Sequence, residues 1–162
     1  MLNMALSRIR QLSAHEVGHT LGFAHNFASS TNNRASVMDY PHPLISLNSD
    51  QIDLNDAYSK GIGEWDKVSV AYSYSEFDSI DEKNELDNIL KQANLKGLRF
   101  ITDNDARSQG GAHVSAHLWD NGKDIISGLD EIFKVRKKAI KDFSKFNICL
   151  LYTSDAADDS DC

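Results

Sequence analysis

Two histidines and a glutamate near the start of the chain have a spacing that suits metal chemistry. His15 and His19 are four residues apart, so on a helix both imidazoles lie on one face and can reach the same cation. Glu16 lies one step round the helix from His15, where its carboxylate can approach a water activated by the metal. A carboxylate in that place can act as a general base. The pattern predicts a hydrolytic metal centre with Glu16 as its catalytic residue.

Gly22 and His25 extend this pattern. Glycine tolerates positive φ, so Gly22 can end the helix and turn the chain back, which brings a third nitrogen from His25 to the cation. Three neutral imidazoles and an open position are typical of catalytic zinc, whereas closed structural sites commonly use cysteine. Five fixed residue types at these spacings have a chance probability on the order of 10⁻⁵ in such a chain. We therefore expect Zn²⁺ as the cofactor, held by His15, His19 and His25.

The elements that must position these residues are mainly helical. Apolar residues recur at helical spacing ahead of the motif: Leu2, Leu6, Ile9 and Leu12. They predict an amphipathic helix that runs into the motif. Further helices are expected over 64–74, over 81–95 with Gly97 as its stop, and over 125–146, with a short strand or extended segment over 98–101. The lysines of 125–146 are interpreted as a solvated face, and the predicted fold class is mainly α.

Composition limits the partners. The chain has 162 residues, with 17 Lys and Arg against 24 Asp and Glu, a formal net charge of −7. A broad electrostatic surface for nucleic acid is therefore not expected. No apolar run approaches the roughly 18 residues of a membrane span, and the N-terminus has no pattern of an export signal.

The C-terminal segment 149–162 differs from the rest of the chain. It holds four Asp, both cysteines and no Lys or Arg, and 149–158 resembles the translation of a transposase-type sequencing adaptor. We expect a non-native tail that does not belong to the fold; the alternative is a genuine acidic tail. Without it the chain has 17 basic and 20 acidic residues, a net charge of −3 and no cysteine, so cysteine usage indicates no redox compartment.

The extended motif resembles that of a known family. His15-Glu16-x-x-His19-x-x-Gly22-x-x-His25, followed by Ser36-Val37-Met38-Asp39-Tyr40, is similar to the signature of the metzincin zinc peptidases. The resemblance implies that Met38 lies in a methionine turn beneath the imidazoles. It also implies that Tyr40 contacts the metal or the developing oxyanion, as in several members, and that a peptide or protein is the substrate.

Two later segments narrow the resemblance. Residues 61–67 and 116–122 are similar to the metzincin domain of large bacterial zinc-dependent metalloproteases, which are secreted, periplasmic or associated with the cell envelope. In metzincins a twisted sheet precedes the active-site helix and pairs with extended substrate. Only fourteen residues precede His15, too few for such a sheet. We expect the N-terminal sheet subdomain to be missing from this chain and to belong to a longer parent.

The expected layout is a partial catalytic domain over 1–148. Residues 1–25 form the active-site helix and third ligand, and 26–148 form a C-terminal subdomain. A fragment of this kind is expected to bind zinc but to be inactive alone. Two alternatives stay open: a zinc-binding, catalytically silent structural or interaction module, and a zinc hydrolase that does not cleave peptides.

Three further histidines are weaker candidates. His42 lies between two prolines just after the expected turn and is interpreted as a loop or rim residue. His113 and His117 are four apart, but the glycines before them and the Asp-Asn-Gly turn after them favour a loop. Asp53-x-Asn55 lacks the later ligand and glycine of a calcium-binding loop, so no calcium site is predicted.

Overall fold

The computed structural model describes residues 2–146 except 79, 108, 111–112 and 117. Its elements, in chain order, are α1 (Leu2–Thr20), the 3₁₀ helix η1 (Ser29–Asn32), β1 (Ser46–Asn48), β2 (Gln51–Asp53), α2 (Glu64–Tyr74), α3 (Glu82–Leu95), α4 (Asp103–Ala106) and α5 (Ile125–Phe146). The expectation of a mainly helical chain is confirmed, with one small sheet in addition. Within the described residues, no helix is long and apolar enough to cross a membrane.

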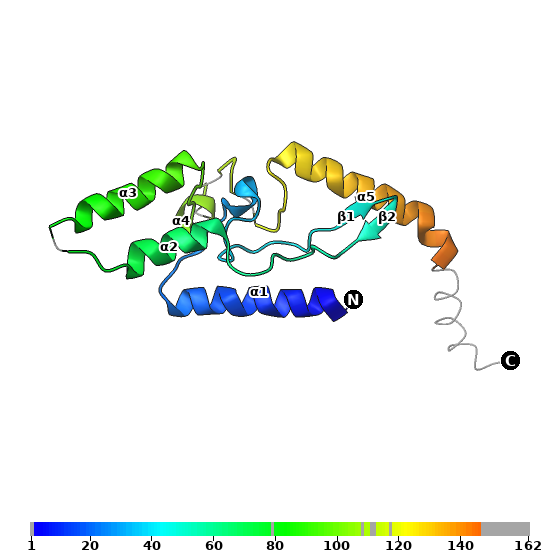
Figure 1. Ribbon diagram of the computed structural model, residues 1–162. Coiled ribbons are helices and arrows are strands. Elements are labelled where there is room, and N and C mark those ends of the chain that lie inside the picture. The colour runs from blue at the N-terminus through cyan, green and yellow to red at the C-terminus, as the bar shows by residue number, and fades with distance from the viewer. Residues whose placement is uncertain (1, 79, 108, 111–112, 117, 147–162) are drawn as a thin grey trace.

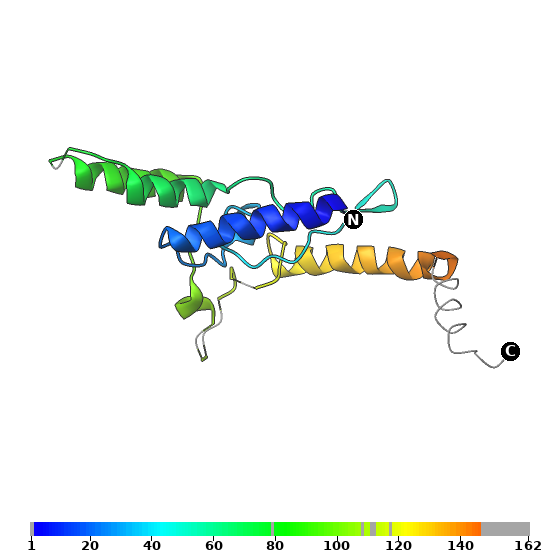
Figure 2. The same cartoon turned by 90° about the horizontal axis from the view of Figure 1, so that it is seen from below.

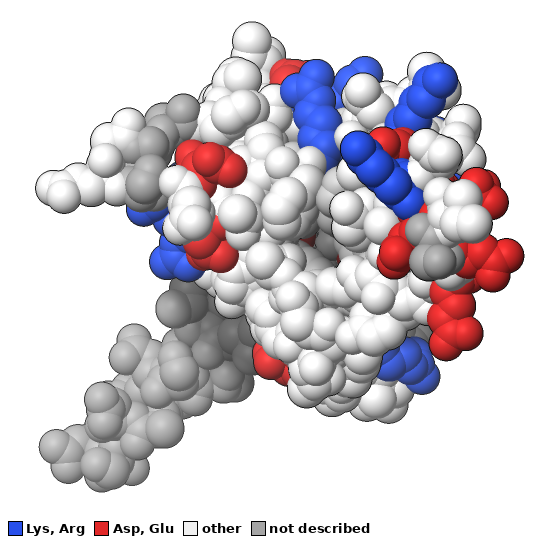
Figure 3. Space-filling view, turned by 90° about the vertical axis from the view of Figure 1, so that its left-hand side faces the viewer, with Lys and Arg blue, Asp and Glu red and all other residues white. Residues whose placement is uncertain are grey.

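The elements lie along one long axis (Figure 1). Helices α2 and α3 pack against each other at one end, and the β1–β2 hairpin contacts α5 at the other. Helix α1 runs roughly antiparallel to α5, with the central loops between them in Figure 1; Figure 2 gives the view from below. In Figure 3 the charged side chains gather over the upper and right-hand parts of this face and at its edges, and uncharged atoms fill its lower centre.

The three helices predicted after the motif are confirmed, whereas the short helix α4 was not predicted. Helices α2 and α5 have the expected bounds, and α3 begins one residue later than expected. Gly97 ends α3 as predicted, because its φ of 72° lets the Leu98 N–H return to the Ala93 carbonyl oxygen at 3.1 Å. Residues 98–101 form no strand, and the Phe27 N–H donates to the Ile101 carbonyl oxygen at 2.8 Å.

The β1–β2 hairpin was not predicted. Its strands pair antiparallel with Ser46 opposite Asp53. The two turn residues, Ser49 and Asp50, both have positive φ, at 50° and 60°. A turn with two such residues usually contains glycine, the strongest local hairpin signal, and this turn has none.

The buried core lies under the loops that follow α1. It consists of Phe27, Ala28, Ile101 and Ala116, with Tyr40, Ala106 and Leu118 packed against it. These residues come from segments far apart in the sequence. The core therefore fixes the loop after α1 against the second half of the chain.

Helix α1 turns a polar face toward the loop that contains Val37. Its buried positions include Ser7, Gln11 and His15, whereas Leu2 is 73% exposed and Ile9 is 60% exposed. The predicted helix is present, but its apolar stripe stays largely exposed, with Leu6 and Leu12 still 38% and 39% exposed. The buried face is polar because its side chains hold the loops around the histidines.

Helix α5 likewise leaves its apolar residues exposed. Ile126 and Phe133 are 81% and 57% exposed, and the helix meets the β-hairpin through its polar side. Lys138 Nζ lies 2.6 Å from an Asp50 oxygen in the hairpin turn and 3.1 Å from an Asp142 oxygen on its own helix. Lys138 is one of the lysines that were expected to form a solvated face. It instead packs on the hairpin, with a side chain only 14% exposed.

Candidate metal centre

Helix α1 brings His15 and His19 to the same face, and the loop after it adds His25. His19 Nε2 lies 3.1 Å from His15 Nε2 and 3.2 Å from His25 Nε2. One nitrogen from each ring lies within 4.8 Å of the others, a group able to hold a metal ion. The structure therefore brings together the three histidines that the sequence singles out. Their assignment as ligands stays a prediction.

Gly22 makes this convergence possible. The helix ends at Thr20, and Gly22 has the left-handed φ of 85°. The Phe23 N–H donates to the Gly18 carbonyl oxygen at 3.0 Å, and the Gly22 N–H donates to that of His19 at 3.0 Å. This pair of bonds is the Schellman motif, which reverses the chain at a helix end. The prediction that Gly22 stops the helix and turns the chain toward His25 is confirmed.

Each imidazole is oriented through its other nitrogen. His15 Nδ1 donates to the Val37 carbonyl oxygen at 2.7 Å, and His19 Nδ1 donates to the Phe23 carbonyl oxygen at 3.0 Å. His25 Nδ1 lies 2.7 Å from Asp103 Oδ2. Because carbonyl and carboxylate oxygens only accept, each Nδ1 carries a proton, and in the neutral ring Nε2 is then the nitrogen that can bind a cation. These three Nε2 atoms lie close together.

The donor set fits a zinc ion. Two nitrogens at 2.0–2.1 Å from a tetrahedral zinc lie about 3.3 Å apart, close to the two Nε2 separations found here. Lone pairs at such a distance repel unless a cation lies between them. A proton on His15 Nε2 does not readily take the place of this cation, because burial and the neighbouring histidines lower the pKa of the His15 imidazole.

Met38 lies against α1 at Gly18, and Tyr40 lies against two of the histidine rings. Met38 is 3% exposed, and its side chain lies so close to α1 that a Cβ on Gly18 would be 2.3 Å from its Sδ. The Tyr40 ring centroid lies 4.6 Å from that of His25 and 5.2 Å from that of His15. The expected tyrosine is therefore next to two of the histidines, and the expected methionine packs on the helix that carries His15 and His19. Their expected roles stay predictions.

A buried carboxylate on α2 holds the segment around Val37, whose carbonyl oxygen accepts the hydrogen bond from His15. Asp66, 5% exposed, accepts from the Val37 N–H at 2.8 Å, from Ser36 Oγ at 2.6 Å and from the Gly63 N–H at 2.6 Å. Gly63 is required here, since a Cβ would come within 1.9 Å of the Ala35 carbonyl oxygen. Sequence reasoning missed Asp66, although it lies in the segment 61–67 that carries part of the family resemblance.

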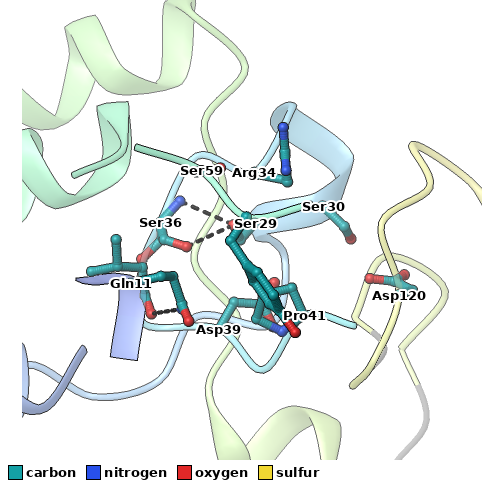
Figure 4. Close-up of a pocket in the computed structure, with 11 residues that line it drawn as sticks. Gln11, Ser29, Ser30, Arg34, Ser36, Asp39, Pro41, Ser59 and Asp120 are labelled. Atoms are coloured by element: carbon teal, nitrogen blue, oxygen red, sulfur yellow. Dashed lines mark hydrogen bonds between the residues drawn. The ribbon is translucent and has the colours of Figure 1, made fainter. Parts of the chain in front are cut away.

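Polar side chains surround a small cavity behind this segment (Figure 4). Ser29 Oγ donates to the Ser36 carbonyl oxygen at 3.1 Å and accepts from the Ser36 N–H at 3.0 Å, while Gln11 Nε2 donates to the Val37 carbonyl oxygen at 3.3 Å. Asp39 also lines this cavity. Its burial raises the pKa of its carboxyl to about 7, so this side chain carries a proton over much of the acidic range.

The other candidate residues that the structure describes are exposed. Glu16 and His19 are exposed, and no hydrogen bond or ion pair to the Glu16 carboxylate occurs among the described residues. His42 is exposed, with its ring 5.4 Å from that of Trp119. His113 lies in a turn bridged to Ala116 and accepts from the Ser115 N–H. His117 lies outside the described residues.

The sequence comparison agrees with the geometry. The family described as Met-zincin matches residues 1–149, and neither the curated proteins nor the solved structures give a match to the chain. The predicted non-native tail over 149–162 lies outside the described residues and stays a prediction. With nearly the whole chain matched and three histidines converging in the described part, the protein is a member of the Met-zincin family.

Proposed function

We propose that the chain carries the catalytic centre of a zinc-dependent endopeptidase of the metzincin type. In this proposal α1 is the active-site helix, His15, His19 and His25 hold the zinc, and Met38 lies in the methionine turn below them. The observation that carries it is the close approach of three Nε2 atoms, on rings that are each oriented by a partner on Nδ1. Membership of the Met-zincin family supports the same reading.

The bound zinc would supply Lewis-acid polarisation of the scissile carbonyl and a lowered pKa for water. Glu16 takes the proton from the attacking water and returns it to the leaving amine, a role that suits an exposed carboxylate next to His15. Tyr40 donates a hydrogen bond to the developing negative charge, since its ring already packs on His25 and His15. The substrate is a peptide or protein segment in extended form.

The test separates zinc binding from turnover. Zinc content and cleavage of a mixed peptide library, with and without a chelator, are measured on this chain and on a longer protein that contains it. Glu16→Ala should keep the zinc and abolish cleavage, because the ligands remain and the general base is lost. His19→Ala should lose both.

A matched control is Glu76→Ala, which removes an exposed glutamate far along the chain from the centre. It should leave zinc content and cleavage unchanged. A Glu16→Ala protein that cleaves at the normal rate contradicts the assignment of the base. Bound zinc without cleavage that a chelator can suppress, in both proteins, favours the catalytically silent module instead.

A further inference from the structure

We propose that Asp103 is the positioning residue of the third zinc ligand, and that its carboxylate tightens zinc binding through His25. The inference rests on the proposed function, in which His25 holds zinc through Nε2. His25 Nδ1 lies 2.7 Å from Asp103 Oδ2, and the His25 side chain is 15% exposed. A hydrogen bond of this length fixes both the tautomer and the orientation of the ring.

Asp103 differs in charge from the partners of the other two rings. His15 and His19 donate to the neutral carbonyl oxygens of Val37 and Phe23, whereas His25 donates to a carboxylate. A negative partner raises the basicity of the opposite ring nitrogen and offsets part of the charge of the metal. Among the three rings, His25 is thus the one whose affinity for a cation depends on an acidic side chain.

A buried amide next to His25 brings the distant carboxylate to the centre. Asn26 is 0% exposed; its Nδ2 donates to the Arg99 carbonyl oxygen at 2.9 Å, and its Oδ1 accepts from the Ile101 N–H at 3.2 Å. These bonds hold segment 99–101 beside the loop of the third ligand. Helix α4 follows directly and begins with Asp103.

The second carboxylate oxygen has its own partner. Arg107 Nη1, one helical turn on, lies 3.4 Å from Asp103 Oδ1, while Oδ2 faces His25. The two contacts point the carboxylate toward the ring from a fixed place on α4. Residues 78 positions apart in the sequence therefore act as one unit.

The test is zinc affinity, measured with Zn²⁺ alone in competition with a chromophoric chelator. Asp103→Ala should weaken binding about 10- to 100-fold, the range typical for loss of a partner of a ligating histidine. Asp103→Asn keeps the shape and can still accept the hydrogen bond but loses the charge, so it should lie between Asp103→Ala and the unmodified chain. The matched control Asp105→Asn, on an exposed residue of the same short helix, should stay within twofold.

A second readout separates positioning from a general loss of structure. The ¹⁵N shifts of the His25 ring in the metal-free chain should report a proton fixed on Nδ1, and Asp103→Ala should shift them toward a mixture of tautomers. The ring of His15 should not respond, because its partner is Val37.

The outcomes are distinguishable. If the unmodified chain binds no zinc, the proposed function fails before the role of Asp103 is reached. If it binds one zinc and both Asp103 variants bind within twofold of it, the inference is overturned and the proposed function stands. If Asp103→Ala does not fold, the affinity of Asp103→Asn decides, and an unchanged value overturns the inference.

Discussion

Because Gly18 lies against Met38, Gly18→Ala should destabilise the chain when Met38 is present and stabilise it when Met38 is replaced by alanine. A Cβ on Gly18 would meet Met38 Sδ at 2.3 Å and Cε at 3.3 Å, and the three nearest heavy atoms all belong to Met38. In Gly18→Ala the Met38 side chain must therefore move. Inserting a methyl group into a packed site costs about 1–3 kcal/mol, while Gly→Ala inside a helix gains about 1 kcal/mol.

The expected net effect of Gly18→Ala is a loss of about 1 kcal/mol in the free energy of unfolding. In a Met38→Ala background the obstructing atoms are gone, so the same substitution should stabilise the chain by up to about 1 kcal/mol. The coupling free energy of the two changes is then about 2 kcal/mol.

Urea unfolding of the four proteins, followed by far-ultraviolet circular dichroism, measures this cycle. The Met38→Ala reference is itself destabilised by about 2–5 kcal/mol, because its methionine is buried. If Gly18→Ala stabilises the unmodified chain as much as it stabilises the Met38→Ala chain, Met38 does not lie against α1 at Gly18.

Two carboxylates give further predictions. Asp66→Ala should lower the free energy of unfolding by about 3–5 kcal/mol, because it leaves the donors on Ser36, Val37 and Gly63 without their acceptor; a loss below about 1 kcal/mol contradicts this network. Burial raises the pKa of Asp39 to about 7, so its ionisation should cost stability progressively between about pH 4 and pH 7. Asp39→Asn should remove that decline and be the more stable protein at pH 8 by a few kcal/mol, as pH-resolved urea unfolding of both proteins can test.

His15 contributes to the pH dependence of stability in the opposite direction to Asp39. Burial lowers the pKa of His15, so the unfolded chain takes up a proton below about pH 6.5 that the folded chain resists. Stability from this histidine is present above that pH and is lost as the pH falls. The difference between the Asp39→Asn protein and the unmodified chain isolates the carboxyl group, because His15 is common to both.

The part of the centre that could be predicted from sequence is the part built by local geometry. His15 and His19 follow from helical spacing, and Gly22 follows from the need for positive φ at a helix end. The same local reasoning gave the bounds of α2 and α5. These features depend on residues within one or two turns of each other, which is the range that spacing describes.

The supporting carboxylates could not be predicted in the same way. Asp66 reaches Val37 across 29 positions, and Asp103 reaches His25 across 78. A single acidic residue has no periodic pattern that would announce a distant partner. Periodicity likewise showed that α1 has an apolar stripe, but not that a polar face, with Gln11 and His15, would be the buried one.

X-ray absorption at the zinc edge of the zinc-loaded chain tests whether His15, His19 and His25 hold the metal. We expect one zinc per chain with three imidazole nitrogens at about 2.0–2.1 Å, and loss of that signal in the His25→Ala protein. A chain that takes up no zinc, or a zinc held by fewer than three imidazoles, would show that these histidines are not the ligand set.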